Sequence, residues 1–401
     1  MEVSRLAHRP EIDLLLCCAR TSLSSEKIYQ IRALLDSRID WPYLIRIAEV
    51  QGLLPLLYFN LKRTLPDLVP GSILHQLHVR FLANAGRNLF LTQQLIKILD
   101  LFQTNAISAI PFRGPTLAVF LYGDLALRSF GDLDILVRRQ DIKTAKALLI
   151  SHGYRLDLSL TQEQEIAFLH SDSEGWFVRH DGQVRVEVHW GEPKDFPFTL
   201  DLEPFWERLE RSSFEGRMVL SFPPEDMLLL LCVHGAEHCW ERLIWVCDLT
   251  ELLRVHTGMD WSRLMNQAEV LGCRRTLFLG LFLACDLLGT TVPAEISKRI
   301  QIDSSVRSLA GQIHERLSQK ENGPIGTWER SLFNLKVTEH LWHRISYCLR
   351  IAFHPTVVDW EALPLPPSLF FLYHLIHPLR VAGKYGWHYL KHLFRKAIPS
   401  G

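Results

Sequence analysis

The stretch from Phe130 to Val137 constrains the fold more than any other part of this sequence. It reads Phe-Gly-Asp-Leu-Asp-Ile-Leu-Val, and its apolar end, residues 133–137, has the length and composition of a short buried strand. Side chains alternate along a strand, so Asp132 and Asp134 would project from one face while the leucine between them packs inward. The chain is therefore expected to build a sheet with one buried face and one face that carries two carboxylates.

A second alternating segment supplies a partner for this strand. Residues 178–190 form a hairpin candidate, because Asp181-Gly182 is a strong tight-turn signal between two alternating runs. In the second run the valines would face the core, and the open face would carry Arg185, Glu187 and His189. Pairing this run beside residues 133–137 would bring Glu187 next to the two aspartates.

The remaining pattern predicts an α+β protein in three regions. Residues 1–103 and 221–401 show the helical spacing of apolar residues, and residues 104–220 hold the strand signals. A proline-rich break at 355–367 precedes a final amphipathic segment rich in basic and aromatic residues. That segment would pack on the protein itself, or contact RNA or a membrane surface. No internal repeat is expected.

Composition excludes several kinds of protein. Lys plus Arg and Asp plus Glu number 44 each, so the overall charge predicts no general grip on nucleic acid, and we expect no DNA partner. The N-terminus lacks the features of a signal peptide, and no apolar run is long enough to span a bilayer. Eight cysteines without a CxxC pair indicate reduced thiols. We expect a cytoplasmic protein without a membrane span.

Two carboxylates this close together favour a bound cation. Asp132 and Asp134 would repel each other unless a hard ion such as Mg²⁺, or Mn²⁺ in its place, lay between them and shared oxygens with nucleotide phosphates. A two-metal phosphoryl-type transfer also needs a third carboxylate, and Glu187 is the candidate. We predict that these three residues bind the metal and are catalytic, with Glu187 also taking the proton from an attacking hydroxyl.

A phosphate site is predicted at the turn from Arg113 to Thr116, which reads Arg-Gly-Pro-Thr. This turn opens a helix, where free backbone N–H groups attract anions. Arg128 lies just before the aspartate strand, where a guanidinium would neutralise charge on the transferring group. His189 would touch a phosphate, orient Glu187, or bond under the sheet. The predicted nucleotide-binding residues are Arg113, Gly114, Thr116, Arg128, Ser129 and His189.

Two histidines in a later helical segment permit three interpretations. His234 and His238 are four residues apart, the spacing of a zinc-binding pair, but the sequence is not His-Glu-x-x-His and no third ligand is evident. They would otherwise line the nucleotide or acceptor pocket, or pack with Trp240, Trp245 and Asp248. Zinc is the weakest of the three, and the other two stay open.

These motifs together resemble an uncharacterised nucleotidyltransferase family within the polymerase-β-like superfamily. The likeness rests on residues 113–116, 121–124, 128, 132–137 and 153–154, and it extends to residues 40–41, 51–57, 187–190, 234–248 and 378–380. It implies a mixed-sheet catalytic core, here residues 104–220, flanked by helices. It also implies Mg²⁺ dependence and the transfer of a nucleoside monophosphate from a nucleoside triphosphate (NTP) to an acceptor.

The resemblance leaves the acceptor open: a protein side chain, a small molecule or an RNA. The Gly-Pro-Thr turn also resembles toxin nucleotidyltransferases, so a toxin-like transferase acting on RNA or protein is one alternative. A non-catalytic nucleotide-binding module is another, because Pro115 has no N–H to donate and stands where the superfamily usually carries Ser or Gly. Glu187 stands where many relatives carry Asp, and its longer arm still reaches a metal.

Overall fold

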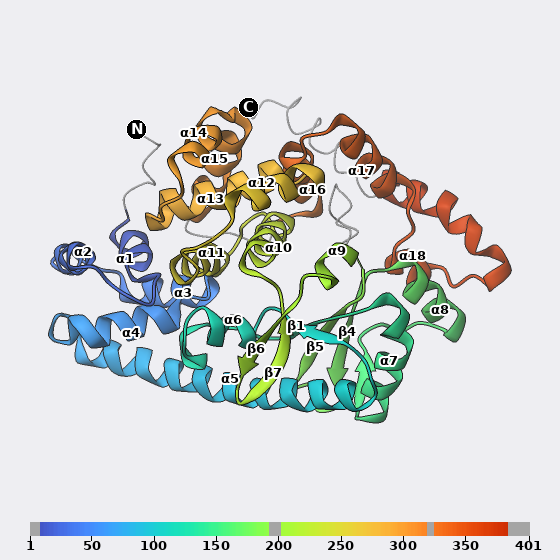
Figure 1. Cartoon of the computed structure of the whole chain (residues 1–401), viewed down its shortest axis with the longest axis horizontal. Helices are drawn as coiled ribbons and strands as arrows, with labels where there is room; N and C mark the ends of the chain where they lie inside the picture. Colours follow the sequence, from blue (N-terminus) through green and yellow to red (C-terminus); the bar gives the residue numbers. More distant parts are fainter. Residues whose placement is uncertain (1–8, 192–201, 319–324, 384–401) are drawn as a thin grey trace, which may run out of the picture.

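The computed structural model describes residues 9–191, 202–318 and 325–383, and it confirms the predicted α+β fold. A region of strands lies between two helical regions (Figure 1). The first helices are α1 (Pro10–Cys18), α2 (Ser25–Leu35), α3 (Trp41–Val50), α4 (Leu54–Thr64), η1 (Pro66–Leu68) and α5 (Gly71–Thr104). The long helix α5 has 34 residues and passes along the strand region.

The central sheet has five strands in the order β1-β2-β5-β4-β3. Its strands are β1 (Ala109–Pro111), β2 (Leu133–Val137), β3 (Tyr154–Leu156), β4 (Glu174–Arg179) and β5 (Arg185–His189). Strands β2 and β5 are parallel, and the other neighbours are antiparallel. The predicted pairing is confirmed, because Asp134 lies directly opposite Glu187 in the β2–β5 register. The predicted hairpin turn is present as well, with Gly182 at φ +70°.

The other elements of the strand region include several that sequence patterns did not predict. They are α6 (Pro115–Phe120), η2 (Leu125–Leu127), η3 (Arg139–Asp141), α7 (Ile142–Ser151), α8 (Gln162–Ser171), α9 (Glu203–Trp206), β6 (Glu210–Phe214) and β7 (Arg217–Ser221). The hairpin β6–β7, the helix α8 and the short strand β3 were not expected. Strand β3 has only three residues, too few for alternation to stand out in the sequence.

The two faces of the central sheet have different surroundings. On one face, the apolar residues of β2 and β5 join a core with α5 and α7; they include Leu133, Ile135, Val186 and Val188. The opposite face carries Asp134 and Glu187 and is turned toward the C-terminal helices. The period-two alternation of these strands thus separates a packed face from a face with carboxylates.

The described residues after β7 form helices and no further strand. The elements are α10 (Pro224–Glu237), α11 (Leu243–Val255), α12 (Trp261–Val270), α13 (Arg274–Leu288), α14 (Ala294–Ile302), α15 (Ser304–Ser318), α16 (Thr327–Val337), α17 (Leu341–Phe353), α18 (Val357–Ala362) and η4 (Pro367–Leu372). Helix α18 lies within the predicted proline-rich break. The basic and aromatic end of the chain, from residue 384, lies outside the described residues.

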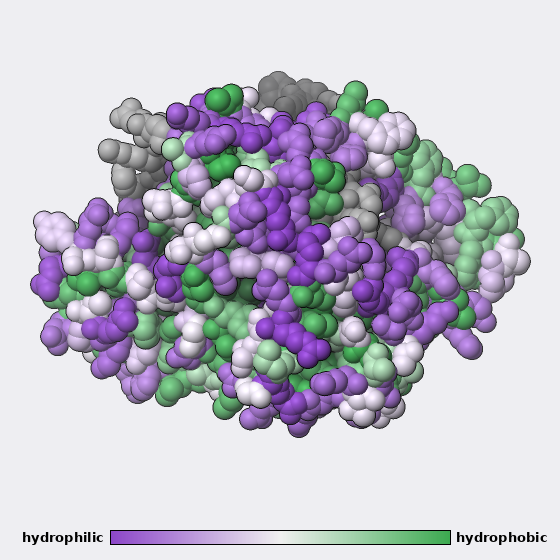
Figure 2. Space-filling model, viewed as in Figure 1, coloured by the Kyte–Doolittle hydropathy of each residue, from purple (hydrophilic) through white to green (hydrophobic). Residues whose placement is uncertain are grey.

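Hydrophobic side chains are exposed on this C-terminal part. Figure 2 shows them at the end of the molecule where Figure 1 places α17. Trp342, Leu349 and Phe353 of α17 are each more than half exposed, as are Phe371 and Leu375 further on. None of the described helices combines the length and the apolar character that crossing a bilayer requires.

The expectation that the chain lacks an internal repeat is wrong. Four helices before the sheet, α1 to α4, match four after it, α10 to α13; we call them the first and second units. Helices α1 and α10 both begin Pro-Glu, and helices α3 and α12 both follow an aspartate and begin with tryptophan. The two units lie side by side (Figure 1), joined by a 2.8 Å hydrogen bond from Thr21 Oγ1 to Glu251.

Equivalent hydrogen bonds support this repeat. The Glu11 carboxylate accepts a bond from the Asp40 backbone N–H at 2.7 Å, and Glu225 accepts the same bond from Asp260 at 2.7 Å. Each aspartate side chain then caps its own helix, α3 or α12. Both helices end at a glycine in the left-handed region, Gly52 at φ +74° or Gly272 at φ +67°. The equivalent N-terminal caps and C-terminal glycines show that α3 and α12 begin and end in the same way.

Candidate active site

The predicted carboxylates line one cavity of about 480 Å³ between the sheet and the C-terminal helices. Asp134 and Glu187 are both buried at its floor, where the parallel pairing of β2 and β5 sets them side by side. His189, two residues beyond Glu187, lies within 3.6 Å of Asp134 and 3.7 Å of Glu187. The structure thus brings together two of the three predicted catalytic carboxylates and one predicted phosphate-binding residue.

Arg113 stands at the centre of this cluster. Its Nη2–H donates to Asp134 Oδ1 at 2.5 Å and lies 3.6 Å from Glu187. The same guanidinium also hydrogen-bonds His234. Burial raises the pKa of Asp134, but Arg113 and His189 outweigh it and lower that pKa to about 2. Asp134 is therefore ionised at neutral pH, and its negative charge is balanced by Arg113.

Glu187 and His189 each have a pKa well above that of the isolated side chain. Burial, together with the charge of Asp134, raises the pKa of Glu187 to about 8, although His189 opposes this. Burial acts to lower the pKa of His189, but Glu187, Asp134 and Glu174 raise it to about 10. Glu174 Oε2 lies 3.3 Å from the other ring nitrogen of His189, Nδ1. His189 is thus a second cation inside the carboxylate cluster.

Asp132 lies at the edge of the cavity and comes immediately before β2. It is only partly buried, and burial raises its pKa, with the charge of Asp134 acting in the same direction. The backbone of the predicted phosphate turn packs against it: a Cβ at Gly114 would meet the Asp132 carbonyl oxygen at 3.1 Å. Gly114 also has φ +55°, so both its conformation and its contact favour glycine.

The remaining predicted phosphate-binding residues are differently placed. Gly114 and Ser129 line the cavity, whereas Thr116 is buried and its Oγ1–H donates to the Arg113 carbonyl at 2.7 Å, inside the turn. Arg128 lines the cavity, but its Nε and Nη2 donate to the two carboxylate oxygens of Asp248 at 2.8 and 2.7 Å. All six nucleotide-binding assignments stay predictions, and the side chains of Thr116 and Arg128 already have partners within the protein.

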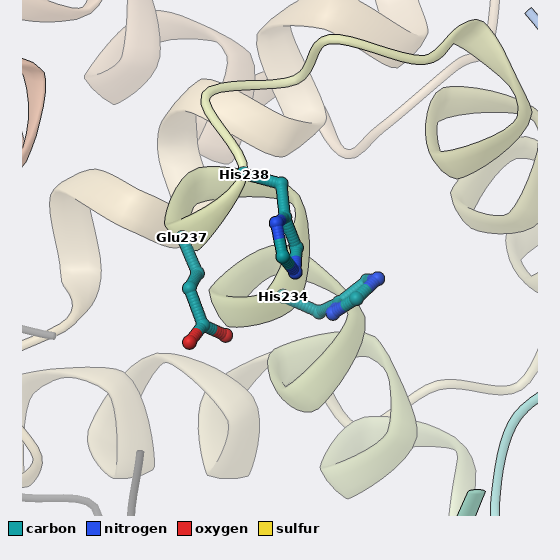
Figure 3. Close-up of side chains that lie close together, drawn as sticks. All are labelled: His234, Glu237 and His238. Atoms are coloured by element: carbon teal, nitrogen blue, oxygen red, sulfur yellow. The ribbon is translucent and has the colours of Figure 1, made fainter. Parts of the chain in front are cut away.

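The predicted histidine pair forms part of the opposite wall. Figure 3 shows His234, Glu237 and His238 at the end of α10, all three of which line the cavity. Both histidine rings contact Trp245, with centroids 5.2 and 5.3 Å away. Burial and Arg113 lower the pKa of both histidines, that of His238 to about 4. The two imidazoles are therefore neutral at pH 7, and they combine a pocket position with packing.

A metal site on these histidines has little electrostatic support. His234, Glu237 and His238 do offer ligand atoms within 4.8 Å of one another. However, the guanidinium of Arg113 is hydrogen-bonded to His234, and Arg330 lines the same wall. A divalent cation would meet these positive charges at close range, so the cluster is better suited to a neutral or anionic group.

Four further residues that sequence patterns did not predict also line the cavity: Arg242, Arg330, Glu174 and Trp176. Arg242 and Arg330 come from the C-terminal helical region, at the start of α11 and within α16. Only one signal in the sequence pointed to any of them: Arg242 lies within the 234–248 segment on which the family resemblance partly rests.

The carboxylate cluster fits a hard cation. Asp134, Glu187 and His189 each have a potential ligand atom, and these atoms all lie within 4.8 Å of one another. Two of the three are carboxylates, whose oxygens are the donors that Mg²⁺ prefers. His189 would have to lose a ring proton before it could bind a metal, because its pKa is raised to about 10. The position of Arg113 shows that the cluster already stabilises a positive charge. Asp132 is not in this group. Metal binding by Asp132, Asp134 and Glu187 stays a prediction.

The chain is similar to a solved structure and matches a family of proteins. A crystal structure of an antigenic nucleotidyltransferase-like protein from Paracoccidioides brasiliensis is similar, with a TM-score of 0.28 and 14% identity over 52% of this chain and 95% of that one. No curated protein matches the chain. A family described as uncharacterised nucleotidyltransferases matches residues 37–289, more than half of the sequence. The chain belongs to that family of uncharacterised nucleotidyltransferases.

Proposed function

We propose that this protein transfers a nucleoside monophosphate from an NTP to an acceptor hydroxyl, with Mg²⁺ or Mn²⁺ as cofactor. The observation that carries the proposal is the parallel pairing of β2 with β5, which sets Asp134 beside Glu187 on the floor of one cavity. The acceptor would be a protein side chain, a small molecule or an RNA. The cavity walls contain aromatic rings that a nucleoside base would stack on, including Trp245 and Trp176.

The metal-binding, proton-accepting and phosphate-binding roles would fall to different residues of the chain. Asp132, Asp134 and Glu187 would hold the metal, which supplies charge neutralisation for the phosphates when bound. Glu187 would accept the proton of the acceptor hydroxyl. Arg113 would release Asp134 and turn its guanidinium to the phosphate that is transferred, since Asp134 would then hold the metal.

One observation favours the alternative of a non-catalytic nucleotide-binding module. Arg113 fills the position next to Asp134 that a catalytic metal would need, and its guanidinium is also bonded to His234. A chain that kept Arg113 there permanently would bind a nucleotide without transferring it. The two functions differ in whether the nucleoside monophosphate is transferred from the bound NTP to an acceptor.

The test is to incubate the protein with each α-labelled NTP and Mg²⁺, alone and with cell extract, beside Asp134→Asn. We expect pyrophosphate release and label transfer from the wild type and neither from the variant. Metal-dependent NTP binding without any transfer would support the binding module. Absence of transfer, pyrophosphate release and metal-dependent binding would refute both. The class of labelled product, protein, RNA or small molecule, would identify the acceptor and test the toxin-like alternative.

A further inference from the structure

The cavity wall opposite the carboxylates contains an arginine without a protein partner. Arg242 immediately precedes α11 and lines the cavity. Across the described residues it forms no ion pair with a carboxylate, and its Nε–H is buried without a hydrogen-bond acceptor. A partly buried cation with an unused donor is unfavourable unless something else supplies the acceptor. A ligand with negative oxygens would supply it.

The other arginines near the aspartates already have partners. Arg113 donates to Asp134, and Arg128 is bound to both carboxylate oxygens of Asp248. Arg242 is close enough to Asp132 for the two charges to influence each other. At this end of the cavity Arg242 is therefore the guanidinium that can bind an incoming anion without first breaking an ion pair.

A turn from the first unit fixes the position of Arg242. Gln51 hydrogen-bonds the two residues that follow Arg242. The Leu243 N–H donates to Gln51 Oε1 at 2.7 Å, and the Ile244 N–H donates to the Gln51 carbonyl at 3.1 Å. The next residue, Gly52, lies directly against the arginine. A Cβ at Gly52 would stand 3.0 Å from Arg242 Nη2 and 3.1 Å from the Ile244 side chain.

We propose that Arg242 binds the polyphosphate of the nucleotide and that the Gln51-Gly52 turn is its positioning element. This inference rests on the proposed function. Its ligand class follows from the neighbouring charges. Asp132 and Asp134 would repel a simple carboxylate or sulfate, whereas a polyphosphate arrives with Mg²⁺, which the same carboxylates attract. The guanidinium fork of Arg242 matches two phosphate oxygens at once.

Binding measurements test the role of Arg242 directly. Inorganic tripolyphosphate, the four common NTPs and the four NMPs would be titrated into the full chain with Mg²⁺ by isothermal calorimetry. We expect Arg242→Gln to weaken tripolyphosphate and NTP binding roughly 10- to 100-fold, the range for a lost hydrogen bond to a charged group, while NMP affinity stays unchanged. The exposed Arg307→Gln is the matched control and should change nothing. Equal affinities in Arg242→Gln and the wild type would overturn the inference.

A glycine pair tests the positioning element. Gly52→Ala should reproduce the selective loss of tripolyphosphate binding, because its new methyl group displaces Arg242. Gly289→Ala is the control, since Gly289 has a similar φ of +70° but open space around its Cβ position. It should lower thermal stability and leave binding intact. If both alanine variants bind tripolyphosphate like the wild type, Gly52 does not position Arg242.

The outcomes separate this inference from the proposed function. Wild-type binding of Mg-NTP that Arg242→Gln leaves unchanged refutes the inference alone. Binding of tripolyphosphate but of no NTP, with loss in Arg242→Gln, refutes nucleotidyl transfer and supports Arg242 as a polyphosphate site. If the wild type binds neither, both proposals fail.

Discussion

The two four-helix units share a design but differ in what their first helix carries. Helix α1 has nine residues, whereas its counterpart α10 has fourteen. The extra length of α10 holds His234 and Glu237, and His238 follows at its C-cap. All three line the cavity, and α1 has no histidine. The second unit therefore reaches the cavity through about one and a half helical turns that the first unit lacks.

The units also differ in what their glycine turns contact. The turn at Gly52 meets Arg242, which belongs to the cavity. The turn at Gly272 meets His343 and His340 at the start of α17, outside the cavity. The first unit therefore supports the site from behind Arg242, and the second unit forms one wall of it.

The largest effect is expected from Asp248, which ties the second unit to the strand region. This fully buried carboxylate accepts hydrogen bonds from Arg128 and from the Tyr122 hydroxyl. Asp248→Ala leaves Arg128 buried without its partner and should lower the free energy of unfolding by about 3–5 kcal/mol, measured by urea denaturation. The double variant Arg128→Met/Asp248→Leu should recover part of the loss, because it removes the orphaned charge. A loss below about 1 kcal/mol in the single variant would contradict this role.

The histidines of the second unit should make stability depend on pH. Burial holds the pKa of His238 at about 4, below the value near 6.5 of an unfolded chain, so the folded state binds fewer protons. The stability from this effect is fully present above pH 6.5 and is lost as the pH falls toward 4. From pH 7 to pH 5 the loss should be roughly 2 kcal/mol. The raised pKa of Glu187 has the opposite effect on stability, because the folded state then binds more protons. The measurement is therefore the difference in unfolding free energy between the wild type and His238→Gln, obtained by urea denaturation at pH 7 and pH 5. Identical changes in the two proteins would refute the role of His238.

Sequence patterns predicted the floor of the site because local rules determine it. The alternation in residues 133–137 and 185–189, and the Asp181-Gly182 turn, decide which side chains share a face. The pairing of Asp134 with Glu187 follows from these once the two strands are neighbours.

The walls of the site depend on long-range packing, which sequence patterns do not reveal. Arg242 lines the cavity because the first unit packs on the start of α11. Arg128 pairs with Asp248, which lies 120 residues later in the sequence. The repeat was detectable in principle, since the two copies share the pattern Asp-Trp, then Ala-Glu-Val-x-Gly. It was missed because the strand region separates the copies and the remaining positions differ.

Gly272→Ala should separate the roles of the two glycine turns. Its Cβ would stand 2.8 Å from the His343 ring, and the left-handed backbone adds strain, so we expect a loss of about 1–2 kcal/mol in urea denaturation. Tripolyphosphate affinity should not change, in contrast to Gly52→Ala. If Gly272→Ala also weakened tripolyphosphate binding, the first turn would have no special connection with the cavity.

The smallest effect concerns the shared caps. Glu11→Gln and Glu225→Gln each keep an acceptor oxygen but lose its charge, so each should cost about 1 kcal/mol of unfolding free energy, because a charge-assisted bond to a backbone N–H is weakened. The two losses should be equal within the precision of urea denaturation, and they should add in the double variant, since the two bonds lie in separate units. A loss in only one variant would mean that the two equivalent hydrogen bonds do not contribute equally to the stability of the fold.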